Sequence, residues 1–337
     1  MPIILIDIKE VIILYQGGFM CKKIYYIVLI SSSLLFSNEN SGYGWDVPNS
    51  SLNIGGYLDI TYDEKREDKF LFNDIAMLFS ASENRFDLLG EVELSHISLD
   101  GKSNNSSDID LNLERLQLSY ALSDEQTLQI GRFNSDIGYW NQSPIPILQE
   151  TTTTPHIVGN FFPKATTGVL FRQNINEDNS FSLTLQENKD IGHQDNEIEI
   201  NRHWGVAYYG TKDDFSWYFS AGRYKEGKGL NSDYMGIGFE YDGELLSLQS
   251  ELFTQQSDKA EDKPYSGYVQ STWHFKEHHD AVVRFESYRD NAMDVKEQIY
   301  LLGYTYRPTS NIALKSEYIY HSQLPLNRFV YSFSVLF

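Results

Sequence analysis

The last eleven residues, Asn327-Arg328-Phe329-Val330-Tyr331-Ser332-Phe333-Ser334-Val335-Leu336-Phe337, decide the fold. Side chains in a β-strand point alternately to opposite faces. One face of this stretch therefore carries Phe329, Tyr331, Phe333, Val335 and Phe337, and the other carries Ser332 and Ser334. An exposed strand of this kind invites aggregation unless the sheet closes. We therefore expect a closed β-barrel, the alternative being a soluble all-β protein that ends on an edge strand.

The same alternation runs back through the chain to Leu52. Stretches of about ten residues place apolar side chains at every second position, which is typical of membrane-spanning β-strands. No helical periodicity of useful length competes with this pattern after residue 40. The sequence predicts an all-β, transmembrane antiparallel β-barrel of about sixteen strands over residues 52–337. Examples of the apolar faces are 52–62, 86–94, 116–122, 181–185, 204–208, 215–219, 235–241 and 269–275.

The connections between these stretches alternate in length, as they do in outer-membrane barrels, with short turns at one end and longer loops at the other. The short connections are rich in turn-forming residues. They are 82–84, 123–125, 212–214, 242–244, 276–279 and 307–311, and the longer ones are 100–109, 134–164, 188–200, 257–264 and 290–296. A soluble sandwich has no reason to alternate so regularly.

Composition supports this interpretation. The mean hydropathy of -0.40 is too low for a bundle of membrane helices, but a barrel keeps one face of each strand polar. Aromatic residues make up 14% of the chain, which suits two lipid–water interfaces. The net charge of -20 argues against nucleic acid as a partner. Cys21 is the single cysteine, so disulfide frameworks and cysteine-based metal sites are excluded, and no cofactor is implied.

The N-terminal region divides into three segments. Residues 20–37 combine Lys22 and Lys23 with an apolar run too short to span a bilayer as a helix, which predicts a cleaved signal peptide. An N-terminal anchor is the alternative. Residues 1–19 fit poorly before a signal peptide, and we hypothesise that they are a mis-annotated upstream extension and that translation starts at Met20; a genuine extended leader is the alternative. Residues 38–51 are expected to form a short periplasmic segment.

Residues 110–172 resemble bacterial outer-membrane porins of the phosphate-selective porin O/P-like group. The resemblance lies in the stretch Leu113 to Tyr120, in Gly131-Arg132-Phe133 before a long loop with Tyr139-Trp140-Asn141, and in Lys164 to Phe171 after it. It implies a sixteen-stranded porin in the cell outer membrane, often a homotrimer, with a loop folded into the pore. The arginine and lysine ladder of the phosphate-selective members is not evident, so phosphate selectivity does not carry over.

The C-terminal strand resembles the assembly signal that the barrel-assembly machinery reads in outer-membrane proteins. The partners that these resemblances imply are this machinery, outer-membrane lipid and lipopolysaccharide, and small solutes or ions.

The long loop 134–163 holds the first set of candidate functional residues. Loops of this length are often functional, and its prolines and aromatic residues indicate an ordered segment. We expect it to fold inward and narrow the channel through Trp140, Asn141, Phe161 and Phe162. The alternative is a loop that caps the barrel or lines a trimer interface.

Charged residues on the predicted polar faces form the second set of candidates. Arg115, Arg172, Arg284, Glu286 and Lys315 are expected to line the pore, where such charges set ion preference. Glu286 lies two residues from Arg284 on the same face and is expected to neutralise it. Mixed charge favours a general pore.

No pattern in the sequence indicates an enzyme or a metal site. His278 and His279 are adjacent but fall in a predicted turn, so a shared metal ion is disfavoured. The sequence therefore predicts passive diffusion of small hydrophilic solutes or ions. Two alternatives stay open: a plugged barrel that serves as an adhesin or interaction protein, and a soluble carbohydrate-binding sandwich.

Overall fold

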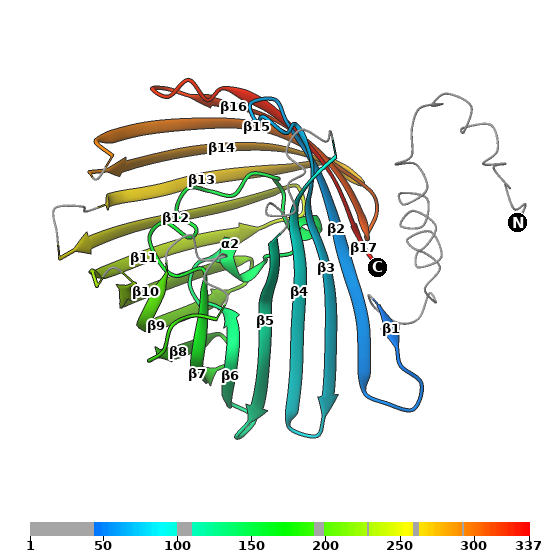
Figure 1. Cartoon of the computed structure of the whole chain (residues 1–337), viewed down its shortest axis with the longest axis vertical. Coiled ribbons are helices and arrows are strands. Elements are labelled where there is room, and N and C mark those ends of the chain that lie inside the picture. The colour runs from blue at the N-terminus through cyan, green and yellow to red at the C-terminus, as the bar shows by residue number, and fades with distance from the viewer. Residues whose placement is uncertain (1–43, 100–109, 192–198, 228, 259–262, 292) are drawn as a thin grey trace, which may run out of the picture.

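The computed structural model describes residues 44–99, 110–191, 199–227, 229–258, 263–291 and 293–337 (Figure 1). The hypotheses on residues 1–37, and the first part of segment 38–51, fall outside these ranges. Within the ranges, no helix is both long enough and apolar enough to cross a membrane.

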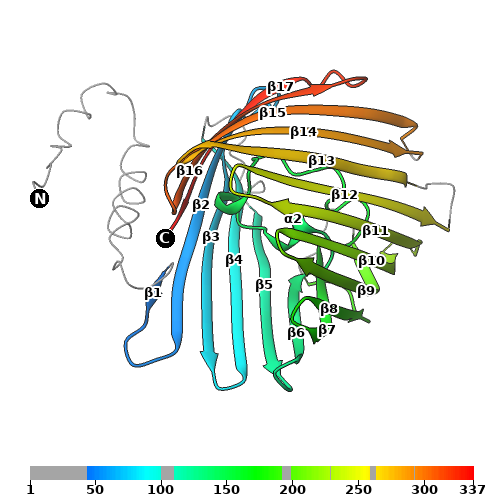
Figure 2. The same ribbon diagram turned by 180° about the vertical axis from the view of Figure 1, so that it is seen from behind.

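The described chain forms one antiparallel sheet that closes into a barrel (Figures 1 and 2). Each strand from β2 onward pairs with the next one in sequence, and β17 pairs back to β2. The prediction of a closed barrel of about sixteen strands is thus confirmed, and β2 to β17 are its strands. The strands are β1 Trp45–Asp46, β2 Leu52–Asp63, β3 Phe70–Glu83, β4 Phe86–Ser98, β5 Asp110–Ala121, β6 Gln126–Asn134, β7 Ala165–Asn176, β8 Asn179–Gln186, β9 Ile200–Lys212, β10 Phe215–Glu226, β11 Asn231–Asp242, β12 Leu246–Ser257, β13 Lys263–Lys276, β14 His279–Asp290, β15 Val295–Thr309, β16 Ile312–His321 and β17 Arg328–Leu336.

The alternation of side chains gives the barrel an apolar outside and a polar inside. On β14, Val283 and Phe285 point outward and are 56% and 38% exposed, whereas Arg284 and Glu286 point inward and are buried. Each strand therefore has an apolar face that suits contact with lipid and a polar face that suits a water-filled lumen.

The C-terminal strand closes the barrel. Val330 to Leu336 pair with Asp63 to Tyr57 of β2, and Phe337 exchanges two backbone hydrogen bonds with Gly56 at 2.8 and 2.9 Å. Phe329, Tyr331 and Phe333 are exposed on the outer face, as their spacing predicts. Val335 differs: it is buried between its cross-strand neighbours Ile312 and Leu58.

The connections follow the predicted alternation. One end of the barrel carries tight turns, in which Asn84, Asp213 and His278 adopt positive φ angles of 56°, 53° and 67°. Hairpin turns of two residues need such angles to match the twist of their strands. The longer connections that the structure describes in full, β2–β3, β6–β7 and β16–β17, begin at the opposite end. The two-residue strand β1, which the sequence pattern did not predict, pairs with Asn53 and Ile54 of β2.

Candidate functional site

The segment 135–164 between β6 and β7 folds into the barrel and forms the centre of the candidate site (Figure 2). It contains a helical turn, α2 Tyr139–Gln142, and a 3-10 turn, η2 Pro146–Leu148. Its residues contact inward-facing side chains of strands from β9 to β17, far away in sequence. We call this segment the inner loop, and the strand faces that it contacts the covered wall.

Aromatic packing holds one side of the inner loop. Phe161 and Phe162 are fully buried, and the ring of Phe162 lies 4.8 Å from that of Phe253 on β12. Trp140 joins the same cluster, together with inward-facing tyrosines of the covered wall. The members of the cluster are Ile137, Trp140, Ile157, Val158, Phe161, Phe162, Ile200, Tyr218, Tyr224, Tyr234, Phe253 and Tyr268. Phe161 and Phe162 therefore attach the loop to the wall and present no surface to the lumen.

Three glutamates of the covered wall accept hydrogen bonds from the backbone of the inner loop. Glu251 on β12 accepts the N–H of Tyr139. Glu317 on β16 accepts the N–H groups of Thr152 and Thr153, the latter at 3.2 Å. Glu286 on β14 accepts the N–H of His156 at 2.8 Å. These contacts fix the loop at three separate points.

Gly138 makes the first of these contacts feasible. Its φ of 76° suits glycine, and an added Cβ would lie 3.0 Å from Oε1 of Glu251. A Cβ at this position would make the carboxylate shift by a few tenths of an ångström, so glycine allows the close approach without that shift.

Three cations of the covered wall donate to the loop in return. Arg284 donates to Thr151 Oγ1 at 2.7 Å and to the Thr153 carbonyl at 2.8 Å. Arg307 donates to the Gln149 carbonyl at 3.1 Å, and Lys315 donates to the carbonyl of Pro146. Buried backbone groups need such partners, because an unsatisfied one costs about 1–3 kcal/mol.

The predicted pore-lining residues thus separate into two groups. Arg284, Glu286 and Lys315 come together beneath the inner loop, with exposed fractions of 2%, 3% and 4%. Arg284 and Glu286 form an ion pair of 2.8 Å. Arg115 and Arg172 lie elsewhere: Arg115 pairs with Glu91 on β4, and the half-exposed Arg172 pairs with Asp136 at 2.9 Å.

Sequence reasoning missed Glu251 and Arg307 as contacts of the loop. The inward position of Glu251 could have been read from the alternation on β12, where Leu248, Leu252 and Thr254 share the opposite face. Arg307 gives no such signal, because it stands at the irregular end of β15, where the register shifts.

The inner faces of β2 to β5 form the opposite side of the lumen and are acidic. Asp59, Asp74, Glu91 and Glu93 lie there, and we call these four residues the acidic wall. Tyr57 donates to Glu91 at 2.7 Å and to Glu93 at 3.1 Å. Lys164, the last residue of the inner loop, lines the same cavity as Asp59 and Asp74.

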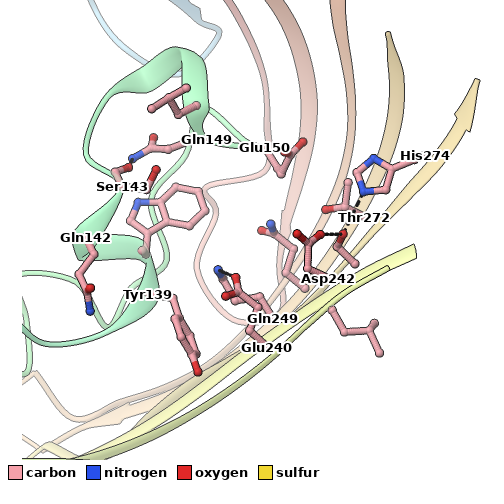
Figure 3. Close-up of a pocket in the computed structure, with 15 residues that line it drawn as sticks. Tyr139, Gln142, Ser143, Gln149, Glu150, Glu240, Asp242, Gln249, Thr272 and His274 are labelled. Atoms are coloured by element: carbon pink, nitrogen blue, oxygen red, sulfur yellow. Dashed lines mark hydrogen bonds between the residues drawn. The ribbon is translucent and has the colours of Figure 1, made fainter. Parts of the chain in front are cut away.

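Two cavities border the inner loop. One, of about 170 Å³, separates the loop from the acidic wall and is lined by Asp59, Asp74 and Lys315 together with Trp140 and Asn141. The other, of about 400 Å³, lies between the loop and β11 to β13 (Figure 3). The predicted residues Trp140 and Asn141 thus lie beside open space, whereas Phe161 and Phe162 do not.

The adjacent histidines do not share a site. His278 occupies the β13–β14 turn, while His279 begins β14 and bonds with the hydroxyl of Tyr304 at 2.6 Å. Among the described residues, no three histidine, cysteine, aspartate or glutamate side chains are grouped so as to hold a metal ion.

Comparisons with known proteins identify the fold. Neither a protein-family model nor a curated protein sequence matches the chain. Among solved structures, an anion-selective porin from Comamonas acidovorans superposes with a TM-score of 0.65 at 13% identity, covering 86% of this chain and 100% of that one. OmpF from Salmonella typhi gives 0.64 at 13% identity, covering 86% and 98%. OmpT of Vibrio cholerae, which has also been solved in a trimer form, gives 0.62 at 10% identity, covering 87% and 99%. The chain therefore has the barrel fold of bacterial porins.

Proposed function

We propose that the chain is an outer-membrane porin that lets small hydrophilic solutes and ions diffuse passively through its lumen. One observation carries the proposal: a closed sixteen-stranded barrel holds an ordered inner loop against one wall and leaves polar cavities beside it. Such a barrel replaces lipid with a polar path and so lowers the barrier to hydrophilic solutes. The inner loop would narrow that path.

The charges next to the lumen favour cations in this proposal. The acidic wall holds four carboxyl groups, of which Glu91 is paired with Arg115, while Asp74 and Glu93 are hydrogen-bonded to each other. Lys164 and Lys315 line the cavity beside this wall, and Arg284 is paired with Glu286. The larger cavity carries Glu240 and Asp242, and its described lining holds no lysine or arginine. Phosphate selectivity, a property of the group that residues 110–172 resemble, has no support in this arrangement.

Planar-bilayer recording of the refolded protein under a salt gradient tests the proposal. We expect stable single-channel current steps, with a reversal potential whose sign indicates that cations permeate better than anions. A folded barrel that gives no steps would refute the pore and favour the plugged interaction protein. Steps with the opposite sign would refute the cation preference alone.

Two further parts of the proposal concern assembly. We propose that the last strand, through Phe329, Tyr331, Phe333, Val335 and Phe337, is recognised by the barrel-assembly machinery. We also propose a homotrimer, the form in which OmpT of V. cholerae has been solved. Removal of Phe337 should reduce insertion into the outer membrane of cells without preventing refolding in detergent. The molecular mass of the detergent-solubilised protein tests whether it is a trimer.

A further inference from the structure

The larger cavity lies between the first half of the inner loop and the turn end of β11 to β13 (Figure 3). It has a volume of about 400 Å³. The loop contributes the rings of Tyr139 and Trp140, and β11 contributes Glu240 and Asp242. Four side-chain amides add hydrogen-bonding capacity around them: Gln142, Gln149, Gln249 and Gln270. The cavity is therefore of ligand size and has both aromatic and polar walls.

The electrostatic character of this cavity is negative. Glu240 accepts a hydrogen bond from Gln249 at 2.9 Å, and Asp242 accepts one from Ser247 at 2.9 Å. These donors are neutral, and each leaves the second carboxylate oxygen without a partner among the described residues. No lysine or arginine belongs to the cavity lining that the structure describes. Two carboxylates without cationic partners in a confined space attract positive charge.

The other charged groups nearby are already paired. Glu150, which also lines the cavity, forms an ion pair with Arg307 at 3.2 Å. His274 bonds with Asp280 at 2.6 Å and with Ser247 at 2.9 Å. Arg284 lies 5.5 Å from the ring of Trp140 and is neutralised by its ion pair with Glu286. Glu240 and Asp242 are therefore the charged groups of the cavity that have no charged partner among the described residues and that a ligand would contact.

Glu240 and Asp242 lie two residues apart on one face of β11, so their Cα atoms are about 7 Å apart. No third histidine, cysteine, aspartate or glutamate among the described residues joins them in a group that could hold a metal ion. Two ammonium groups joined by a short carbon chain can each meet one of the two carboxylates. The ring of Tyr139 offers an apolar surface for that chain, with added attraction between ring and cation.

Building on the proposed porin function, we propose that this cavity binds small organic ammonium ions on their way through the lumen. Glu240 and Asp242 accept hydrogen bonds from the ammonium groups, and the amide oxygens of Gln142 and Gln149 accept from the remaining N–H donors. Asp242 directly precedes the β11–β12 turn, so this part of the cavity lies near the turn end of the barrel.

Calorimetric titration of the refolded protein with 1,4-diaminobutane tests this assignment, with 1,4-butanediol as the uncharged probe of equal length. The intact protein should bind the diamine saturably and the diol at least about tenfold more weakly, since each lost charged hydrogen bond is worth about 1.5–3 kcal/mol. The double variant E240Q/D242N should lose a similar factor for the diamine. Equal binding of both probes, or unchanged binding by the double variant, would overturn the proposal.

A matched control is available on the opposite side of the barrel. Asp87 on β4 also lies at the turn end and accepts a hydrogen bond from a serine, Ser82, at 2.5 Å, but does not line the cavity. D87N removes the same charge and should leave diamine binding unchanged; a loss equal to that of the double variant would mean that overall charge, and not this cavity, attracts the probe.

Bilayer recording of the same proteins separates the two proposals. Normal channels together with no diamine binding would refute the cavity assignment and leave the porin standing. Diamine binding without channels would refute the porin and keep the cavity.

Discussion

The covered wall and the acidic wall use the same kind of residue in different ways. Both present charged side chains at every second position of their strands. On the covered wall Arg284 and Glu317 are bonded to the inner loop, whereas on the acidic wall Asp59 and Asp74 border a cavity. We therefore expect a lumen-facing charge in this barrel to act on solutes where it borders a cavity. The predictions below test that contrast.

Breaking the ion pair beneath the loop should have the largest effect. R284M removes five hydrogen bonds to the loop and wall and leaves Glu286 buried without its cation. Loss of one partner of a buried pair costs about 3–5 kcal/mol. We expect a lower unfolding temperature in detergent and larger, noisier channels. R289M, which changes an exposed arginine on the same strand, should behave like the unchanged protein, and an R284M protein of unaltered stability would contradict this role.

Removing an aromatic anchor of the loop should have a somewhat smaller effect. F162A deletes a fully buried ring that packs on Phe253, which costs about 3–4 kcal/mol in a well-packed core. The expected result is faster proteolysis within the inner loop while the barrel stays intact. F285A removes an outward-facing ring of the same size and serves as the control. Proteolysis at the control rate in F162A would show that the loop is held without this ring.

Neutralising the acidic wall should change selectivity and not stability. D59N/D74N removes two carboxylates that line the smaller cavity, so the ratio of cation to anion permeability should fall by about twofold or more. E317Q removes a carboxylate of the covered wall and should loosen the loop with little direct effect on that ratio. Reversal potentials in a salt gradient measure both. A larger shift with E317Q than with D59N/D74N would reverse the assignment of the two walls.

Acid should weaken the attachment of the loop by a smaller amount. Burial lowers the pKa of His156 to about 4 from its ordinary value of 6.5; its ring stacks on Tyr288 and is also near Lys263, Glu286 and Asp290. Because the unfolded state takes up a proton first, the contribution of His156 to stability is complete above pH 6.5 and falls progressively toward pH 4. H156Q should flatten this part of the stability profile, whereas H279Q should not. An unchanged profile in H156Q would exclude His156 as the cause.

The sequence predicted the barrel well because each strand repeats the same local rule. The alternation from Leu52 to Phe337 depends only on which face meets lipid, so the barrel class and the approximate number of strands follow from it. The inward direction of Arg284 and Lys315 followed in the same way. Their partners could not be predicted, because Thr151 and Pro146 lie more than a hundred residues away in sequence and meet them only when the loop folds inward.

The roles of individual aromatic residues within the inner loop could not be predicted from the sequence either. Trp140 and Phe162 belong to one aromatic-rich loop, yet Trp140 borders both cavities while Phe162 is enclosed against β12. Composition identifies such residues as ordered but does not say which side of the loop each one occupies. That choice depends on the shape of the covered wall, where inward tyrosines of β10, β11 and β13 offer a surface for rings.

Cysteine modification of the open channel tests the contrast between the walls most directly. N73C places a thiol beside the cavity at the acidic wall, and S266C places one beneath the loop, where Ser266 is 1% exposed and contacts His156. Cys21 lies before the barrel, so no native barrel cysteine interferes. A positively charged, water-soluble methanethiosulfonate should reduce the current through N73C channels rapidly and leave S266C channels unchanged. Equal modification at both positions, or faster modification of S266C, would contradict the account.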